Sequence, residues 1–242
     1  QNWPRGAVYT QIWLTSLGYN AYLMRRYRES SWVKSIGNGA YILSNDQLEW
    51  PGGLYALQTQ LKLPVHAGGR TALVHIGAAH YVRFHESKIF LFALPQTMLP
   101  KWYLNYNWEA PILFRRTGLL PYDIADSFTE MKHRDFIIRI SAAERAILEM
   151  LYLVPTHQGF DEAFKIMEGL MTLRPQLMQK LLEYCNSIKV KRLFLYMAEK
   201  CQIPVFTRLD QNKIDLGQGK RSIINNGILD KKYQITIPKE YA

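Results

Sequence analysis

The 242-residue sequence has little cysteine, no long apolar run and only one acidic residue in its first 43 positions. Its two cysteines, Cys185 and Cys201, lack the number and spacing of a disulfide framework, a zinc knuckle or a redox pair. We therefore expect free thiols and a cytoplasmic location. The best candidate membrane span, AILEMLYLV, is interrupted by Glu149 and is shorter than the about 18 apolar residues that a crossing helix requires. No membrane association is predicted.

Signatures of common enzymes and metal sites are also missing. A nucleotidyltransferase needs a Gly-Ser pair followed by an acidic Asp-x-Asp or Asp-x-Glu motif, and the sequence has neither. A G-x-S-x-G nucleophile elbow is absent as well. His66, His75, His80 and His85 do not fall on one helix face, and no cysteine or carboxylate completes a metal-binding set. We predict a protein that is not an enzyme and has no cofactor and no bound metal.

The surplus of basic residues lies at the two ends of the chain. Net charge is +10, and residues 1–43 hold five Lys or Arg against one acid, while residues 188–242 hold eleven against five. The segment 44–187 is neutral, with fourteen of each. Two separated basic regions are typical of proteins that bind a polyanion such as nucleic acid. Charge that only maintains solubility is the alternative, especially for the C-terminal block.

Residues 7–43 predict a winged helix-turn-helix. A first helix is expected from about Val8 to Leu17, with an apolar face and a stop at Gly18. Asn20 can cap a second helix, in which Leu23 and Tyr27 should face inward. The outward side chains would then enter a major groove. The predicted contacts on this helix are Asn20, Tyr22, Arg25, Arg26 and Arg28.

A hairpin follows the second helix. Asn38-Gly39 stands between two β-prone runs, WVKSI and AYIL, which is the strongest short-range hairpin signal and predicts a type I′ turn. Lys34 and Asn38 are predicted to contact phosphates beside the groove. A small helical subdomain with solvated arginines is the alternative. A winged helix usually has one more helix before these two, and we expect it to be missing from a chain that opens at Gln1.

The remaining sequence predicts a larger α+β domain, so that the chain divides into a DNA-binding domain at 1–48 and a second domain at 49–242. The runs KIFLFA, PILFRR and FIIRI predict a small mixed sheet. Residues 141–201 predict an array of four helices, the first opened by a Ser141–Glu144 capping box. Asn226-Gly227 predicts a late hairpin. We assign a second basic surface to Lys189, Lys191, Arg192, Lys220, Arg221, Lys231 and Lys232.

Several long segments resemble the AbiEi-type antitoxins of bacteria. They include WLTSLGYN, ESSWVKSIGNGAYIL, PGGLYALQTQL, GGRTAL, ISAAERAILEMLYLVP, KVKRLFLYMAEK, DLGQGKR and KYQITIPKE. These antitoxins are the transcriptional regulators of abortive-infection, type IV toxin–antitoxin systems. The resemblance implies an N-terminal winged helix that represses its own promoter from inverted repeats. It also implies a C-terminal domain that counteracts a nucleotidyltransferase toxin without a stable complex.

Two other functions fit parts of the sequence. An enzymatic activity of the C-terminal domain, directed at the toxin or its nucleic-acid substrate, is the first. A non-regulatory RNA-binding protein is the second, and it would need aromatic side chains exposed on a sheet. Binding to a duplex with a defined repeat, as opposed to binding to single strands, distinguishes these alternatives.

Overall fold

The computed structural model describes residues 3–78 and 88–241 of the chain. Two of the histidines considered above, His80 and His85, lie outside the described residues. The chain forms two compact units. The first comprises residues 1–66, 87–116 and 130–140, and the second comprises residues 67–86, 117–129 and 141–242.

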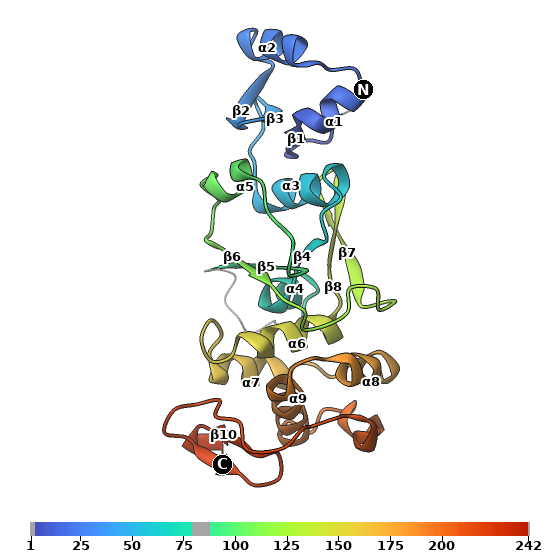
Figure 1. Cartoon of the computed structure of the whole chain (residues 1–242), viewed down its shortest axis with the longest axis vertical. Coiled ribbons are helices and arrows are strands. Elements are labelled where there is room, and N and C mark those ends of the chain that lie inside the picture. Colours follow the sequence, from blue (N-terminus) through green and yellow to red (C-terminus); the bar gives the residue numbers. More distant parts are fainter. Residues whose placement is uncertain (1–2, 79–87, 242) are drawn as a thin grey trace. The chain divides into compact units, whose positions relative to one another are not determined.

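The first unit begins with two short helices and a small antiparallel sheet (Figure 1). The strands lie in the order β1-β3-β2, and β3 pairs antiparallel with both neighbours. Leu14, Met24 and Ile42 are buried between the helices and the sheet, because apolar side chains leave water when these layers pack. These elements are β1 (Tyr9–Thr10), α1 (Gln11–Ser16), α2 (Ala21–Glu29), β2 (Val33–Gly37) and β3 (Ala40–Leu43).

The first helix is shorter than predicted. Tyr9 and Thr10 pair with β3 as a strand, so α1 begins only at Gln11, with the Thr10 hydroxyl accepting a bond from the Trp13 N–H at 3.4 Å. The predicted apolar face was wrong in part, since Ile12 is 75% exposed and Leu17 is 41% exposed. Helical periodicity placed both side chains on the predicted buried face, but the small sheet covers only one side of a six-residue helix.

The predicted hairpin is confirmed, and its turn type is not. Gly37 pairs with Ala40 across the two-residue loop Asn38–Gly39. Only Gly39 of these two has a positive φ, +69°, whereas a type I′ turn needs positive φ at both. A register shift between Ser35 and Gly37 lies immediately before this turn.

A mixed five-stranded sheet follows, in the order β6-β5-β4-β8-β7, with β5 and β6 parallel. The predicted strands at 88–93, 111–116 and 136–140 are β5, β6 and β8, whereas β4 and β7 were not predicted. A π-helical turn at Ala56–Gln60 continues α3. The elements are α3 (Trp50–Tyr55), β4 (Val65–Ala67), β5 (Ile89–Ala93), α5 (Lys101–Asn105), β6 (Ile112–Arg116), β7 (Phe128–His133) and β8 (Phe136–Ser141).

The second unit is mainly helical. The four helices predicted within 141–201 are present, and α6 is the central one, packing against α4, α7, α8 and α9. Nearly every side chain of α6 is buried, so this helix forms the core of the unit. The helices are α4 (Gly69–His75), α6 (Ala143–Leu153), α7 (Phe160–Glu168), α8 (Pro175–Tyr184) and α9 (Ile188–Lys200).

The predicted capping box of α6 was wrong. Ser141 is the last residue of β8, and its hydroxyl donates to Glu149 Oε2 at 2.7 Å. Glu144 binds Arg174 instead, accepting from its Nε at 3.0 Å and its Nη2 at 2.8 Å. A buried carboxylate needs hydrogen-bond donors. Here the donors to Glu144 come from Arg174, which is distant in sequence, and not from the N-terminal backbone of the helix as in a capping box.

The last hairpin is also displaced from its predicted turn. Asn226-Gly227 precedes β9 (Ile228–Asp230), and the chain reverses later, between β9 and β10 (Ile235–Ile237). A Cβ atom at Gly227 would lie 2.4 Å from the Ile237 carbonyl oxygen. The glycine is therefore used for close backbone approach, not for the reversal of the hairpin.

Candidate nucleic-acid interface

A tight turn between α1 and α2 sets the direction of α2. Gly18 has φ +91°, a conformation that an L side chain disfavours, and the Tyr19 N–H donates to the Leu14 carbonyl at 2.9 Å. The Asn20 side chain then accepts from the Leu23 N–H at 2.9 Å, which confirms it as the N-cap. Two helices joined by such a turn are the core of a helix-turn-helix.

One face of α2 carries an exposed row of four side chains, Tyr22, Arg25, Arg26 and Glu29, hereafter the outer row. Their spacing of three and four residues aligns them on a single face. On the opposite side Met24 is fully buried. The predicted Arg28 is exposed too, but it lies beside this row and not within it.

The outer row contains two arginines and one acid, Glu29, so its net charge is positive. Arg25 Nε lies 2.9 Å from Glu29 Oε1, an exposed pair that contributes little to stability. Neither Arg26 nor Arg28 has a carboxylate within 4.0 Å among the residues that the structure describes. In Figure 1, α2 lies at one end of the first unit, with β2 and β3 leading from it toward α5. The row therefore has the charge and exposure that contact with a polyanion requires.

The hairpin is anchored at its turn. A Cβ atom at Gly37 would lie 2.7 Å from the Trp102 Cβ, so the hairpin backbone rests directly on α5. Lys34 is exposed, and its Nζ donates to the Asp46 carbonyl oxygen at 3.3 Å. Asn38 is exposed beside the anchored glycine. Both predicted hairpin contacts are thus accessible, although the hairpin has less freedom than an isolated wing.

The second basic surface includes two residues that are not on the surface. Lys191 is 4% exposed and Arg192 is 3% exposed, so their assignment to a surface was wrong. Arg192 donates to the carbonyl oxygens of Leu216 (2.7 Å), Gly219 (2.6 Å), Gln234 (3.2 Å) and Gly217 (3.0 Å). Burial lowers the pKa of the Arg192 guanidinium. This side chain holds the C-terminal loop together.

Lys189 has a similar structural use. Its Nζ donates to the carbonyl oxygens of Tyr152 at 2.8 Å and Val154 at 2.6 Å. These carbonyls lie at the end of α6, where helical C=O groups lack partners within the helix. A lysine is well suited to them, because its ammonium group donates up to three hydrogen bonds. The charge of Lys189 is thus directed to the protein backbone.

The remaining cations of the second basic surface are accessible to different degrees. Lys220 and Lys231 are exposed. Lys232 is exposed and forms an ion pair with Glu199, which lowers the pKa of that carboxyl although burial opposes the shift. Arg221 is half-buried, and its Nη1 donates to the Gln218 carbonyl at 3.1 Å. Only Lys220, Lys231 and Lys232, hereafter the tail lysines, present exposed ammonium groups from this set.

No cluster of three or more His, Cys, Asp or Glu side chains able to hold a metal occurs within residues 3–78 and 88–241. Burial raises the pKa of both thiols, to about 11 for Cys185 and about 12 for Cys201, so neither is a reactive thiolate at neutral pH. The helices that the structure describes are all too short or too polar to cross a bilayer.

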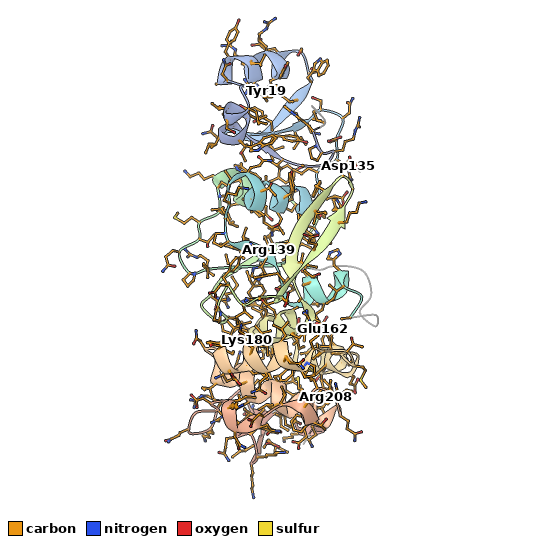
Figure 2. The ribbon with its side chains drawn as sticks, turned by 90° about the vertical axis from the view of Figure 1, so that its right-hand side faces the viewer. Tyr19, Asp135, Arg139, Glu162, Lys180 and Arg208 are labelled. Atoms are coloured by element: carbon orange, nitrogen blue, oxygen red, sulfur yellow. The ribbon has the colours of Figure 1, made fainter. Side chains whose placement is uncertain are left out.

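An aromatic groove beside α2 was missed by the sequence analysis. Its volume is about 680 Å³, and its lining includes four aromatic residues, Trp3, Tyr19, Tyr27 and Trp32, and two charged residues, Arg5 and Asp135. Trp32 is 72% exposed. The sequence shows a cluster of aromatic residues on both sides of α2, but only the fold brings their side chains together in one groove. Figure 2 labels Tyr19 and Asp135, which come from segments far apart in the sequence.

Comparison with known proteins adds sequence and fold evidence. The family described as transcriptional regulator, AbiEi antitoxin, type IV TA system matches residues 86–238, and its N-terminal domain family matches residues 1–84. No curated protein sequence matches. The crystal structure of the RV2827C protein from Mycobacterium tuberculosis superposes with a TM-score of 0.63 at 12% identity, covering 95% of this chain and 85% of that one. At this identity the likeness concerns the fold alone.

Proposed function

The chain belongs to the family of AbiEi antitoxin transcriptional regulators of type IV toxin–antitoxin systems, and from this premise we propose that it represses its own operon by binding inverted repeats in the promoter. A transcriptional regulator binds DNA, and an antitoxin has a cognate toxin. The family is not one of enzymes. In the proposal residues 1–48 act as a winged helix-turn-helix, with α2 as the recognition helix.

The outer row of α2 is the observation that carries this proposal. A helix with an exposed cationic and aromatic face, set by a tight turn and a capped start, has the form of helices that enter the major groove. Arg25 and Arg26 would donate to base edges, since arginine binds guanine with two hydrogen bonds. Asn20, Tyr22 and Arg28 would contact the sugar-phosphate backbone of the DNA on either side of these bases.

The hairpin contributes phosphate contacts in the proposal. Lys34 is exposed in β2, before the bulge, and Asn38 is exposed in the turn of the hairpin. An ammonium group that already donates to a carbonyl oxygen, as Lys34 does to Asp46, keeps two further N–H groups for a phosphate. Phosphate contacts of this kind position a protein on the duplex without reading sequence.

Promoter binding by variants tests the recognition helix. Changing Arg25→Ala and Arg26→Ala together should lower affinity for the operon's own promoter on the order of 100-fold or more. The control carries Arg116→Ala and Arg208→Ala, which removes two exposed arginines elsewhere and the same charge. Equal affinity in the two double variants would remove α2 from the recognition role.

The antitoxin activity is proposed to reside in residues 49–242 and to counteract a nucleotidyltransferase toxin without a stable complex. The tail lysines support this, because they are exposed and belong to a basic region separate in sequence from α2. Cationic side chains can compete for the phosphates of a nucleotide or RNA that the toxin uses. Such competition requires no contact between toxin and antitoxin.

Growth of cells that express the toxin tests this second activity. Residues 1–48 belong to the same compact unit as residues 87–116, so full-length variants are preferable to a fragment. The Arg25→Ala, Arg26→Ala variant should rescue growth like the parent, and a variant with all three tail lysines changed to glutamine should not. Lys101, Lys165 and Lys180, also exposed, provide the matched triple glutamine control.

Two results would contradict the assignment. Loss of rescue in the α2 variant would show that the two activities are not separate. Full rescue by the tail variant would show that these lysines are not part of the antitoxin surface. The proposal expects a nucleotidyltransferase gene beside the gene for this chain, and its product is the toxin to be used.

A further inference from the structure

We propose that the aromatic groove binds unpaired bases of a nucleic-acid strand that runs on from a duplex held at α2. The groove is formed within the first unit by the N-terminal segment, α2 and the start of β2. The position of the groove beside a duplex rests on the proposed function, whereas the suitability of its side chains for binding bases does not. Four aromatic side chains and one arginine in a single groove are the composition of single-strand binding sites.

The rings have a geometry that suits a stacked base. Tyr27 and Trp32 are nearly parallel, with an interplanar angle of 28° and centroids 6.4 Å apart. A planar base between two rings needs roughly 3.5 Å on each side. Trp32 is 72% exposed, so a small rotation of its side chain makes this space without disturbing a core. Tyr19 continues the aromatic wall, with its centroid 6.3 Å from that of Tyr27.

Arg5 supplies the contact for the strand's phosphate. Its side chain is 70% exposed, and its Nη1 lies 3.7 Å from Asp46 Oδ1, beyond hydrogen-bond length. The guanidinium group therefore retains donors that can bind a phosphate. Asp135, an exposed residue of the groove lining, can accept a hydrogen bond from a base N–H group.

The same residues disfavour other occupants. Paired duplex bases have both faces covered by their neighbours and cannot reach the ring faces. A free nucleotide has the required chemistry, but Tyr27 and Trp32 come from the end of α2 and the residue before β2. A strand leaving a duplex at α2 would pass this point.

Fluorescence titration of the full-length protein tests the proposal. The probes are the single strand dA12, the blunt duplex dA12·dT12 and free dAMP. Binding of dA12 should quench tryptophan fluorescence. Trp32→Leu and Arg5→Gln should each weaken dA12 binding on the order of 5- to 100-fold, and Trp32→Tyr, which keeps a stacking ring, should restore most of it. Duplex affinity should be unchanged in all three.

Two control variants outside the groove and the Arg25→Ala, Arg26→Ala variant complete the experiment. Tyr184→Leu and Arg208→Gln remove an exposed aromatic ring and an exposed arginine outside the groove, and they should leave dA12 binding unaltered. The Arg25→Ala, Arg26→Ala variant should lose binding to the operon's promoter and keep dA12 binding. If that variant binds the promoter normally while Trp32→Leu loses dA12, the recognition-helix proposal fails and the groove stands.

Three outcomes would overturn the groove proposal. The first is no detectable binding of dA12 by the parent. The second is equal dA12 affinity in the parent and in Trp32→Leu. The third is competition by dAMP at the same concentration as dA12, which would make the groove a site for free nucleotides.

Discussion

In α2, Arg25 and Arg26 extend into solvent, whereas in α9 Arg192 is 3% exposed and donates to four backbone carbonyl oxygens. Both regions are rich in cations in the sequence. The difference is what surrounds them: α2 has packing on one side only, while α9 lies under a loop whose carbonyls need donors. A basic segment is therefore available to a polyanion only where the protein backbone does not use its charge.

The largest expected effect comes from removing the buried guanidinium. Arg192→Met leaves the carbonyls of the C-terminal loop without their donor, and we expect the free energy of unfolding to fall by about 3 kcal/mol. Urea denaturation measures this, with Arg208→Met, an exposed arginine in the same unit, as the control. A loss below about 1 kcal/mol for Arg192→Met would contradict the structural role given to that residue.

A smaller effect, and one that depends on pH, is expected at Glu144. Burial alone would raise the pKa of this carboxyl, but hydrogen bonds from the Arg174 side chain and backbone outweigh it and hold the pKa below its usual range. The stabilisation is therefore complete above the unfolded pKa of about 4.3 and is lost as pH falls through the lower folded pKa.

Glu144→Gln should accordingly destabilise the protein by about 2 kcal/mol at neutral pH, and the deficit should shrink as pH falls below about 4. Unfolding measured at a series of pH values gives this difference directly. A deficit that is the same at every pH would show that lost packing, and not the Arg174 ion pair, causes it.

The smallest stability effect is expected in α2. Arg25→Ala breaks only an exposed ion pair with Glu29, so the free energy of unfolding should change by less than about 0.5 kcal/mol. Thermal unfolding of this variant beside Arg192→Met gives the two ends of the comparison. A large loss in Arg25→Ala would mean that α2 uses its cations for folding, as α9 does.

Features fixed by near neighbours could be predicted from the sequence. The Asn20 cap, the turn at Gly18, the hairpin at Asn38-Gly39 and the four helices after residue 141 are each set by contacts within a few residues. The exposure of Arg25 and Arg26 followed from the spacing of apolar residues around a single helix. These are the parts in which local preference and tertiary structure agree.

Features that depend on distant contacts could not be predicted. Ser141 and Glu144 have the pattern of a capping box, but Glu149 and Arg174 bind them instead. Nothing in the sequence around Arg192 shows that carbonyls 24 or more residues away will surround it. The aromatic groove has the same origin, because Asp135 reaches it from a separate part of the chain.

The most direct test of the central claim is the salt dependence of binding to the operon's promoter. Each cation that contacts a phosphate or releases a counterion contributes about 0.9 to the slope of log affinity against log salt concentration. The account predicts a slope smaller by about 0.9 for Lys34→Ala, which removes a phosphate contact, and a lower affinity with a nearly unchanged slope for the Arg25→Ala, Arg26→Ala variant, which removes base contacts. It predicts no change for the variant with three tail lysines changed to glutamine. An unchanged slope in Lys34→Ala, an unchanged affinity in the α2 variant, or a reduced slope in the tail variant would contradict it.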